Sequence, residues 1–316
     1  MPEATSGLRS FEASTRAAPR LLATLWRQRA RSLLCPDTPS LDGQLALVTG
    51  GSEGIGLGTC RGLLRRGARV VIAARSPEKA ERALAELRAE LGAAAPVSFL
   101  PLDLSDLDRV VQATKQLAGQ TLDLLVCNAG LWPRRHAVSA QGHELAFATN
   151  VLGHHLLVRR LASGSLASGA RVVILTGDIY ILADDCTPDY DFRTPRGGML
   201  AYCRSKLGNL WLAGELQRRQ PELDVRIAHP GVVSTGLVGA RGGVSEWLSR
   251  RMLLDADAGA QTTLYCATQP GLPKGAYLHN TAGRMQLRPE DPACDTARAA
   301  VLWDRCEALC AGRLPE

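Results

Sequence analysis

The sequence predicts one α/β domain, a doubly wound parallel sheet with helices on both faces. Apolar runs alternate with helical stretches from residue 45 to about 235 without a linker-like break. Apolar residues make up 46% of the 316 residues, enough for one large core. No repeat is visible. Strands are expected at residues 45–49, 69–74, 97–101, 123–127, 170–176 and 224–228.

A glycine-rich turn follows the first strand. Gly50, Gly54 and Gly56 stand between the strand Leu45–Thr49 and a helical stretch, and a second strand follows at Arg69–Ala74. Glycine lets a diphosphate approach the helix N-terminus, where N–H groups and the helix dipole favour negative charge. The flanking strand and helix are the context that this motif requires. The sequence therefore predicts a Rossmann-type dinucleotide site.

Two later strands are also followed closely by polar or small residues. Asp103 follows the strand at 97–101, and Asn128-Ala129-Gly130 ends the strand at 123–127. Small residues at that end would let the chain pass close to a cofactor. Asp103 also suits the N-cap of the next helix, as do Ser105 and Asp106, so two roles remain open for it, a contact with the cofactor and a helix cap.

Tyr202 and Lys206 lie four residues apart in a helical stretch, about one turn from each other on one face. An ammonium beside a phenol favours the phenolate and lowers its pKa from about 10. A group of this kind can exchange a proton with a carbonyl or alcohol oxygen while hydride moves at carbon.

The charge distribution argues against a nucleic-acid partner. The net charge of +6 is spread out, and aromatic residues are only 4% of the chain. A nucleic-acid reader would need a concentrated basic face or a known module. Much of the positive charge is interpreted as solvated arginines on helix surfaces: Arg61, Arg65, Arg66, Arg82 and Arg88.

The cysteines and histidines indicate neither a disulfide framework nor a metal site. The nine cysteines are odd in number and include no Cys-x-x-Cys pair, which favours a reduced, intracellular compartment. His154 and His155 are adjacent, so on a helix they point in different directions and do not form a ligand pair. No metal is expected.

The first 40 residues form an N-terminal arm of different composition, rich in arginine. Between Arg20 and Leu34, apolar residues follow one broad helical stripe. No apolar run approaches the roughly 20 residues of a membrane span. Three interpretations remain: a helix docked on the domain, an interfacial membrane anchor, and an organelle-targeting segment. The expected location is the cytoplasm or a membrane surface, with the mitochondrion as an alternative.

Six motifs in order resemble the short-chain dehydrogenase/reductase family across residues 41–316. Passages at 150–157, 201–207 and 259–266 resemble its retinol dehydrogenase-like branch. The motifs are Thr49-Gly50-Gly51-Ser52-Glu53-Gly54-Ile55-Gly56, Asp103-Leu104, Asn128-Ala129-Gly130, Asn150, Tyr202 with Lys206, and Pro230-Gly231 with Thr235.

The resemblance implies a catalytic group. Tyr202 would be the general acid/base, and Lys206 would lower its pKa and bind the nicotinamide ribose. Asn150 would hold a helix distortion and a water that relays protons to Lys206. A serine at the end of the fifth strand would hydrogen-bond the substrate oxygen.

At that serine position this chain has Gly177, and Thr176 falls on the preceding serine. Losing an oxyanion-type donor costs about 100- to 1000-fold in turnover. Either Thr176 or Asp178 takes over, with Thr176 as the catalytic candidate, or catalysis is weak. The alternative function is therefore a nucleotide-binding scaffold or regulator of the same fold. An isomerase or epimerase is a third hypothesis.

The resemblance also implies the cofactor contacts. Arg75 and Ser76 follow the second strand, where an acidic residue would select NAD, so NADP is expected and NAD is less favoured. Glu53 in the turn argues against this choice. The predicted cofactor residues are Gly50, Ser52, Glu53, Gly54, Ile55, Gly56, Arg75, Asp103, Leu104, Asn128, Ala129, Gly130, Tyr202, Lys206, Pro230, Gly231, Val233 and Thr235.

Two segments are expected to shape the substrate site, a long loop at 178–201 and the position of the family's lid at 236–255. The apolar content of the second segment suggests a lipophilic, retinoid- or steroid-like substrate. Solvated loop or packing roles explain both segments nearly as well. Family members often pair through the helix that bears Tyr202, so a homodimer is the default expectation.

Overall fold

A computed structural model describes residue 28, residues 32–233 and residues 253–315. One sheet runs through it in the order β3-β2-β1-β4-β5-β6-β7-β8, and every pairing is parallel except that of β8. The predicted fold class and all six predicted strands are confirmed. The strands are β1 Leu45–Thr49, β2 Arg69–Ala74, β3 Val97–Pro101, β4 Leu122–Cys127, β5 Leu166–Leu175, β6 Asp224–His229, β7 Tyr277–His279 and β8 Gly283–Arg284.

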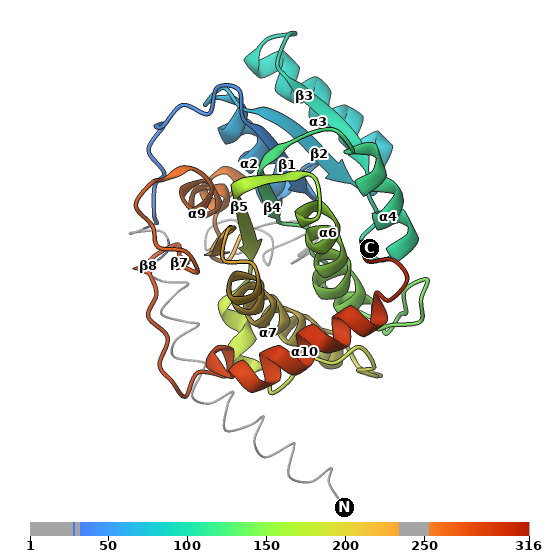
Figure 1. Cartoon of the computed structure of the whole chain (residues 1–316). Helices are drawn as coiled ribbons and strands as arrows, with labels where there is room; N and C mark the ends of the chain where they lie inside the picture. Colours follow the sequence, from blue (N-terminus) through green and yellow to red (C-terminus); the bar gives the residue numbers. More distant parts are fainter. Residues whose placement is uncertain (1–27, 29–31, 234–252, 316) are drawn as a thin grey trace, which may run out of the picture.

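Helices cover both faces of the sheet (Figure 1). Helices α2, α3 and α9 lie on one face, α4, α6 and α7 lie on the other, and α10 packs on α7. Their bounds are α2 Gly54–Leu64, α3 Pro77–Leu91, α4 Leu107–Gln116, α5 Leu145–Phe147, α6 Gly153–Ala162, α7 Pro195–Arg219, α9 Ala256–Thr268 and α10 Thr296–Leu309.

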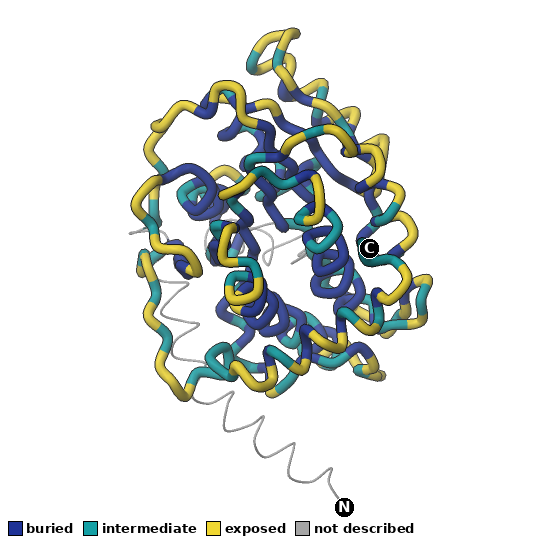
Figure 2. Tube along the Cα trace, in the orientation of Figure 1, coloured by how far each residue is buried: buried dark blue, intermediate teal, exposed yellow. Residues whose placement is uncertain are grey.

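The two faces form two separate cores because side chains alternate along each strand. In β1, Leu45 and Leu47 pack toward α4, α6 and α7, whereas Ala46 and Val48 pack toward α2, α3 and α9. Burial on both sides is why these strands read as continuous apolar runs. Figure 2 shows the strands and the inner sides of the helices as the buried part of the chain.

Side-chain caps fix where several helices begin, because they satisfy otherwise unpaired amides. Ser76 accepts from the Lys79 amide at α3, and Thr194 accepts from the Gly197 amide at α7. At α4 the cap is Asp106, while Asp103 accepts from the amide and hydroxyl of Ser105 one turn earlier. Of the two roles open for Asp103, the helix cap is therefore wrong.

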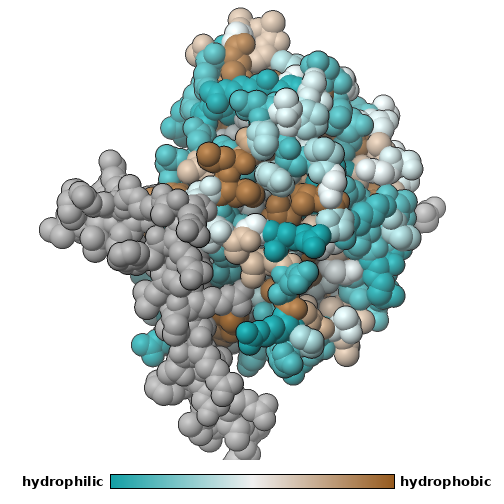
Figure 3. All heavy atoms as spheres, turned by 90° about the vertical axis from the view of Figure 1, so that its left-hand side faces the viewer, coloured by the Kyte–Doolittle hydropathy of each residue, from teal (hydrophilic) through white to brown (hydrophobic). Residues whose placement is uncertain are grey.

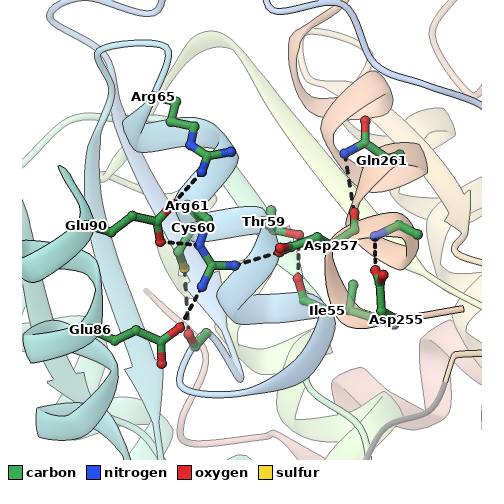
Figure 4. A network of polar contacts seen from close by, with 12 residues as sticks. Ile55, Thr59, Cys60, Arg61, Arg65, Glu86, Glu90, Asp255, Asp257 and Gln261 are labelled. Atoms are coloured by element: carbon green, nitrogen blue, oxygen red, sulfur yellow. Dashed lines mark hydrogen bonds and ion pairs between the residues drawn. The ribbon is translucent and has the colours of Figure 1, made fainter. Parts of the chain in front are cut away.

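Arg61 joins three helices on the α2 face (Figure 4). Its guanidinium lies 2.6 Å from Glu86, 2.7 Å from Glu90 and 2.6 Å from Asp257. The hydrogen bond from Arg61 lowers the pKa of Glu90. The interpretation of Arg61 as a solvated arginine is wrong, since its side chain is only 13% exposed. Arg66 is also buried, where it donates to the Gly62 carbonyl.

The end of the N-terminal arm contacts the domain. The Leu33 amide donates to the Asn280 carbonyl, and the Cys35 amide donates to Gln261 at 3.0 Å. Residues 32–40 thus lie against the domain without forming a helix, while residues 1–27 and 29–31 lie outside the described residues, so the docked helix stays a prediction. On the side of the molecule seen in Figure 3, hydrophobic groups gather in patches among hydrophilic ones. Within the described ranges, no helix has the length and apolar character needed to cross a membrane.

Candidate active site

The glycine-rich turn between β1 and α2 is packed so closely that it requires glycine at several positions. Gly50 and Gly54 have φ of 64° and 56°, which favour glycine. A Cβ on Gly56 would lie 2.2 Å from the Gly50 carbonyl oxygen. Glu53 is the N-cap of α2 but makes no side-chain cap hydrogen bond. The first-turn amides of α2 therefore keep their capacity for an anion, and the turn fits a diphosphate.

A hydrogen-bond network ties this turn to the ends of two other segments. The Asn128 side-chain amide donates to the Thr49 carbonyl at 2.8 Å, and the Thr49 hydroxyl accepts from the amides of Asn128 and Ala129 at 2.9 and 3.0 Å. This hydroxyl lies 2.9 Å from His154 Nε2, and His154 Nδ1 lies 3.1 Å from the Asn150 carbonyl.

The contacts fix the protonation of His154. A carbonyl only accepts, so Nδ1 carries the proton and Nε2 accepts from Thr49. Burial lowers the pKa of His154 to about 4, which keeps the ring neutral. His155 instead contacts Glu307 at 2.7 Å, so the two histidines do point in different directions. Thr49 and His154 were missed as site residues, although His154 follows Asn150 by one helical turn.

The edge expected to meet the adenosine ribose carries more charge than the sequence analysis recognised. Arg75 is exposed beyond β2, and Ser76 caps α3. The Lys79 ammonium lies 2.9 Å from each carboxylate oxygen of Glu53. This missed lysine balances the Glu53 charge that argued against a 2′-phosphate. Asp103 is half-buried and Leu104 is buried beyond β3.

Tyr202 and Lys206 lie close together on α7, as their spacing predicts. The Lys206 ammonium is 5.4 Å from the centroid of the Tyr202 ring and donates to the Leu175 carbonyl at 3.2 Å. Burial lowers the pKa of Lys206 to about 8, so the amine is mostly protonated at pH 7. The Trp132 ring, which was not predicted, stacks on Tyr202 with 5.6 Å between centroids.

The pKa of Tyr202 differs from the expectation. Burial raises the pKa of the phenol above its usual value, and the nearby Cys203 adds to the rise. The expected lowering of this pKa by Lys206 is therefore wrong for this structure, because removal of the phenolate from water is the main influence on it. Tyr202 is a neutral phenol here, in the form that donates a proton.

Asn150 lies in a π-helical turn at Ala148–Leu152, so the helix distortion expected at this residue is present. Its side-chain carbonyl accepts from the Leu131 amide at 2.9 Å. Its side-chain amide donates to the Leu131 carbonyl at 3.0 Å and to the Ser205 hydroxyl at 2.9 Å. These bonds attach the loop after β4 to α7, next to Lys206. A Cβ on Gly130 would be 3.6 Å from the Lys206 ammonium, an ordinary van der Waals contact, so the contacts of the described residues do not require glycine there.

Neither candidate replaces the missing serine hydroxyl in this structure. Thr176 is buried, and its hydroxyl donates to the Lys206 carbonyl at 2.9 Å, so its proton is already used. Asp178 is buried and contacts His279 at 2.9 Å. Gly177 is extended and half-buried, and a Cβ there would meet nothing nearer than His229 Nδ1 and Ile179, both at 3.9 Å. A serine side chain would have room there.

Asp178, His229 and His279 bring potential metal-ligand atoms within 4.8 Å of one another, a cluster that the sequence spacing did not reveal. The Thr281 amide donates to His279 Nδ1 at 3.1 Å, so the proton of the neutral ring lies on Nε2 and is donated to Asp178. A metal would need the lone pair of that same nitrogen. The contacts therefore favour a buried hydrogen-bonded pair of Asp178 and His279 over a metal site.

The segment predicted to cover the nicotinamide is described as far as Val233. Pro230 is buried, Gly231 has φ of 86°, and Val233 bridges to Leu254. Thr235 and most of the 236–255 segment lie outside the described residues. The Gln28 side chain accepts from the Val232 amide at 3.0 Å and donates to its carbonyl at 3.3 Å. The N-terminal arm thus reaches this segment, which the sequence analysis did not foresee.

Comparisons with known proteins agree with this geometry. The family model for short chain dehydrogenases matches residues 44–179. Retinol dehydrogenase 14 from Homo sapiens is 31% identical over 302 residues, covering 86% of this chain and 88% of that protein. The chain belongs to the short-chain dehydrogenase/reductase family. It is an NAD(P)-dependent oxidoreductase, as are the enzymes of this family.

Other short-chain dehydrogenases/reductases match over similar lengths. Polyprenol dehydrogenase from Mus musculus is 33% identical over 299 residues, covering 89% of this chain and 88% of that protein. The crystal structure of an uncharacterized protein from Mycobacterium Paratuberculosis has a TM-score of 0.71 and 29% identity, over 90% of this chain and 100% of that one. A short chain dehydrogenase from Burkholderia cenocepacia J2315, solved in complex with NADP, has a TM-score of 0.60 and 25% identity. The match covers 78% of this chain and 99% of that one.

Proposed function

We propose that this protein is an NADP-dependent oxidoreductase that interconverts a carbonyl and an alcohol on a lipophilic molecule, retinoid- or steroid-like. The observation that carries the proposal is the pairing of Tyr202 with Lys206 on α7, 5.4 Å from ring centroid to ammonium. A phenol and an ammonium in this arrangement serve proton transfer at a substrate oxygen. The test is consumption of NADPH with a panel of hydrophobic aldehydes and ketones.

Each residue of the group has a defined task. The Tyr202 hydroxyl donates its proton to the carbonyl oxygen during reduction and takes it back during oxidation. The protonated Lys206 stabilises the phenolate that reduction leaves on Tyr202. Together with Asn150, Lys206 also orients the ribose side of the site and returns a proton to Tyr202. A bound nicotinamide supplies or accepts the hydride. The Gly50–Gly56 turn would hold its diphosphate, and Asn128, Ala129 and Gly130 would line its path.

The choice of NADP is supported by the cations beyond β2. Arg75 is exposed there, and Lys79 lies on the same turn of α3 as the capping Ser76. Both cations suit a 2′-phosphate, which a charge-assisted hydrogen bond would hold. The NADP complex of the related Burkholderia enzyme is consistent with this choice.

Arg75→Ala should raise the KM for NADPH about 10- to 100-fold, because a charge-assisted bond contributes about 1.5–3 kcal/mol. The KM for NADH should change less than threefold. Initial rates with both cofactors check this, with Arg82→Ala on the exposed side of α3 as the control. An equal change for both cofactors would show that Arg75 does not meet the 2′-phosphate.

A lipophilic substrate is supported by aromatic side chains beside Tyr202. Trp132 stacks on the catalytic ring, and Phe192 lines the same cavity as Trp132 from the loop before α7. The predicted loop at 178–201 is shorter in the structure, because a 3₁₀ turn occupies Asp178–Leu182 and α7 begins at Pro195. The names of the related retinol dehydrogenase 14 and polyprenol dehydrogenase indicate long apolar alcohols for those proteins. The same chemistry on a large apolar body is our proposal here.

A second candidate, a nucleotide-binding scaffold or regulator with weak or no catalysis, is favoured by Gly177. If the enzyme proposal holds, Gly177→Ser should raise kcat about 10- to 100-fold, because it returns a hydroxyl to a space with room for it. Gly164→Ser, at a turn where a Cβ meets nothing within 4 Å, is the control. Tight NADPH binding by calorimetry with no turnover by the parent or the Gly177→Ser variant would support the scaffold.

A further inference from the structure

A cavity of about 590 Å³ opens between two loops at the start of α7. The loop after β4 contributes Trp132 and a basic run, and the 178–201 loop contributes Phe192 and the residues that begin the helix. A volume of this size suits a small molecule. Its lining is Trp132, Arg134, Arg135, His136, Phe192, Arg193, Thr194 and Pro195.

The cavity adjoins the catalytic tyrosine. Trp132 lines the cavity and also stacks on Tyr202, with 5.6 Å between centroids and 11° between ring planes. The two loops are held against each other, since a Cβ on Gly198 in the first turn of α7 would lie 1.9 Å from the Pro133 carbonyl oxygen. A molecule in the cavity would therefore lie against Trp132, the ring that stacks on Tyr202, between two segments that approach each other closely.

Positive charge dominates this lining. Arg135 and Arg193 are exposed, and neither forms an ion pair with any residue in the described ranges. The N-terminal end of the 25-residue helix α7, capped by Thr194, adds its dipole. Two acids lie near His136: Asp191, at 3.9 Å, and the buried Glu144, whose pKa is raised overall by burial although the charge of His136 lowers it in part. His136 also packs edge-on against Phe192, with 5.3 Å between ring centroids, so the lining combines arginines with aromatic rings.

We propose that the substrate of the Tyr202 site carries an anionic group, a carboxylate or phosphate, on an apolar body. The anion binds Arg135 and Arg193, the body packs on Trp132 and Phe192, and the carbonyl reaches Tyr202. The inference rests on the proposed function, and it restricts the lipophilic substrates to acidic ones. An arginine binds a carboxylate through two parallel hydrogen bonds. An uncharged analogue cannot form these charge-assisted bonds, so it should bind more weakly than the acid.

The test compares acids with their own methyl esters. The wild-type protein is assayed with NADPH and two aldehyde acids of different length, 4-carboxybenzaldehyde and 4′-formylbiphenyl-4-carboxylate, and with the methyl ester of each. For at least one of the two lengths, we expect kcat/KM to be at least about 10-fold higher for the acid than for its ester. The difference should lie in KM rather than in kcat, and it should become smaller as the salt concentration rises. Arg135→Gln combined with Arg193→Gln should abolish the preference by lowering kcat/KM for the acid to the value for its ester. Arg109→Gln, on the exposed side of α4, is the matched control.

The inference is overturned if acid and ester react at equal rates at both lengths, in the wild-type protein and in the double variant. In that case the turnover itself still supports the proposed function. If no aldehyde is reduced, calorimetric binding of terephthalate decides. Binding that the double variant loses and the control keeps sustains the anion site while the proposed function fails. Absent or unchanged binding overturns the inference.

Discussion

Tyr202→Phe should lower kcat for carbonyl reduction about 100- to 10,000-fold, the contribution expected of a general acid. Burial keeps the Tyr202 phenol protonated, and the variant keeps the ring that stacks on Trp132 but has no proton to give. Steady-state kinetics with NADPH measure the loss. Calorimetry should give an NADPH affinity within about threefold of wild type, since the phenol acts on the substrate oxygen.

Tyr190→Phe is the matched control for this variant. Tyr190 lies in the loop before α7, stacks on Phe192 with 5.9 Å between centroids and lies under Arg204. The Tyr190→Phe variant also removes one phenol hydroxyl, at a position in the chain not far from Tyr202, and it should retain most of the activity. Full turnover by Tyr202→Phe would exclude Tyr202 as the acid and, with it, the proposed mechanism.

Gly56→Ala should abolish dinucleotide binding and destabilise the fold by about 1–3 kcal/mol. The new Cβ would lie 2.2 Å from the Gly50 carbonyl oxygen and 2.6 Å from the Asn128 side-chain amide. Both neighbours belong to the turn and the network that position the diphosphate, so neither can move without opening the site. Calorimetry with NADP and chemical denaturation measure the two effects.

Gly214→Ala is the control for the glycine variant, because a Cβ at this position in α7 meets nothing within 4 Å. Removing a helical glycine should leave stability unchanged or raise it by up to about 1 kcal/mol. If Gly56→Ala binds NADP as tightly as wild type, the turn does not hold the diphosphate.

The sequence was sufficient for the sheet and for the pairing of Tyr202 with Lys206, because both depend on local patterns. Apolar runs mark the six predicted strands, of which β3 lies at the edge of the sheet, and a four-residue spacing places two side chains on one helix face. Strands β7 and β8 were missed because they span three and two residues and leave no periodic signal.

The contacts that hold the site depend on residues far apart in the chain. Thr49 and His154 are 105 positions apart, yet their bond links the glycine turn to the π-helical turn at Asn150. The pKa of Tyr202 was predicted in the wrong direction because a spacing rule reveals the neighbouring cation but not the burial of the phenol. The missing hydroxyl at Gly177 was visible in the sequence, whereas the use of the Thr176 proton by Lys206 was not.

Deuterium transfer tests the central claim most directly, that this site moves hydride while Tyr202 moves the proton. Wild-type protein would be incubated with NADPH labelled at C4, in separate samples for the two faces of the ring, and with the hydrophobic and acidic aldehydes. We predict one deuterium on the former carbonyl carbon, from one of the two labelled faces, for each NADPH consumed. Bound NADPH that keeps its label, with unlabelled or absent alcohol from every aldehyde, would contradict the account.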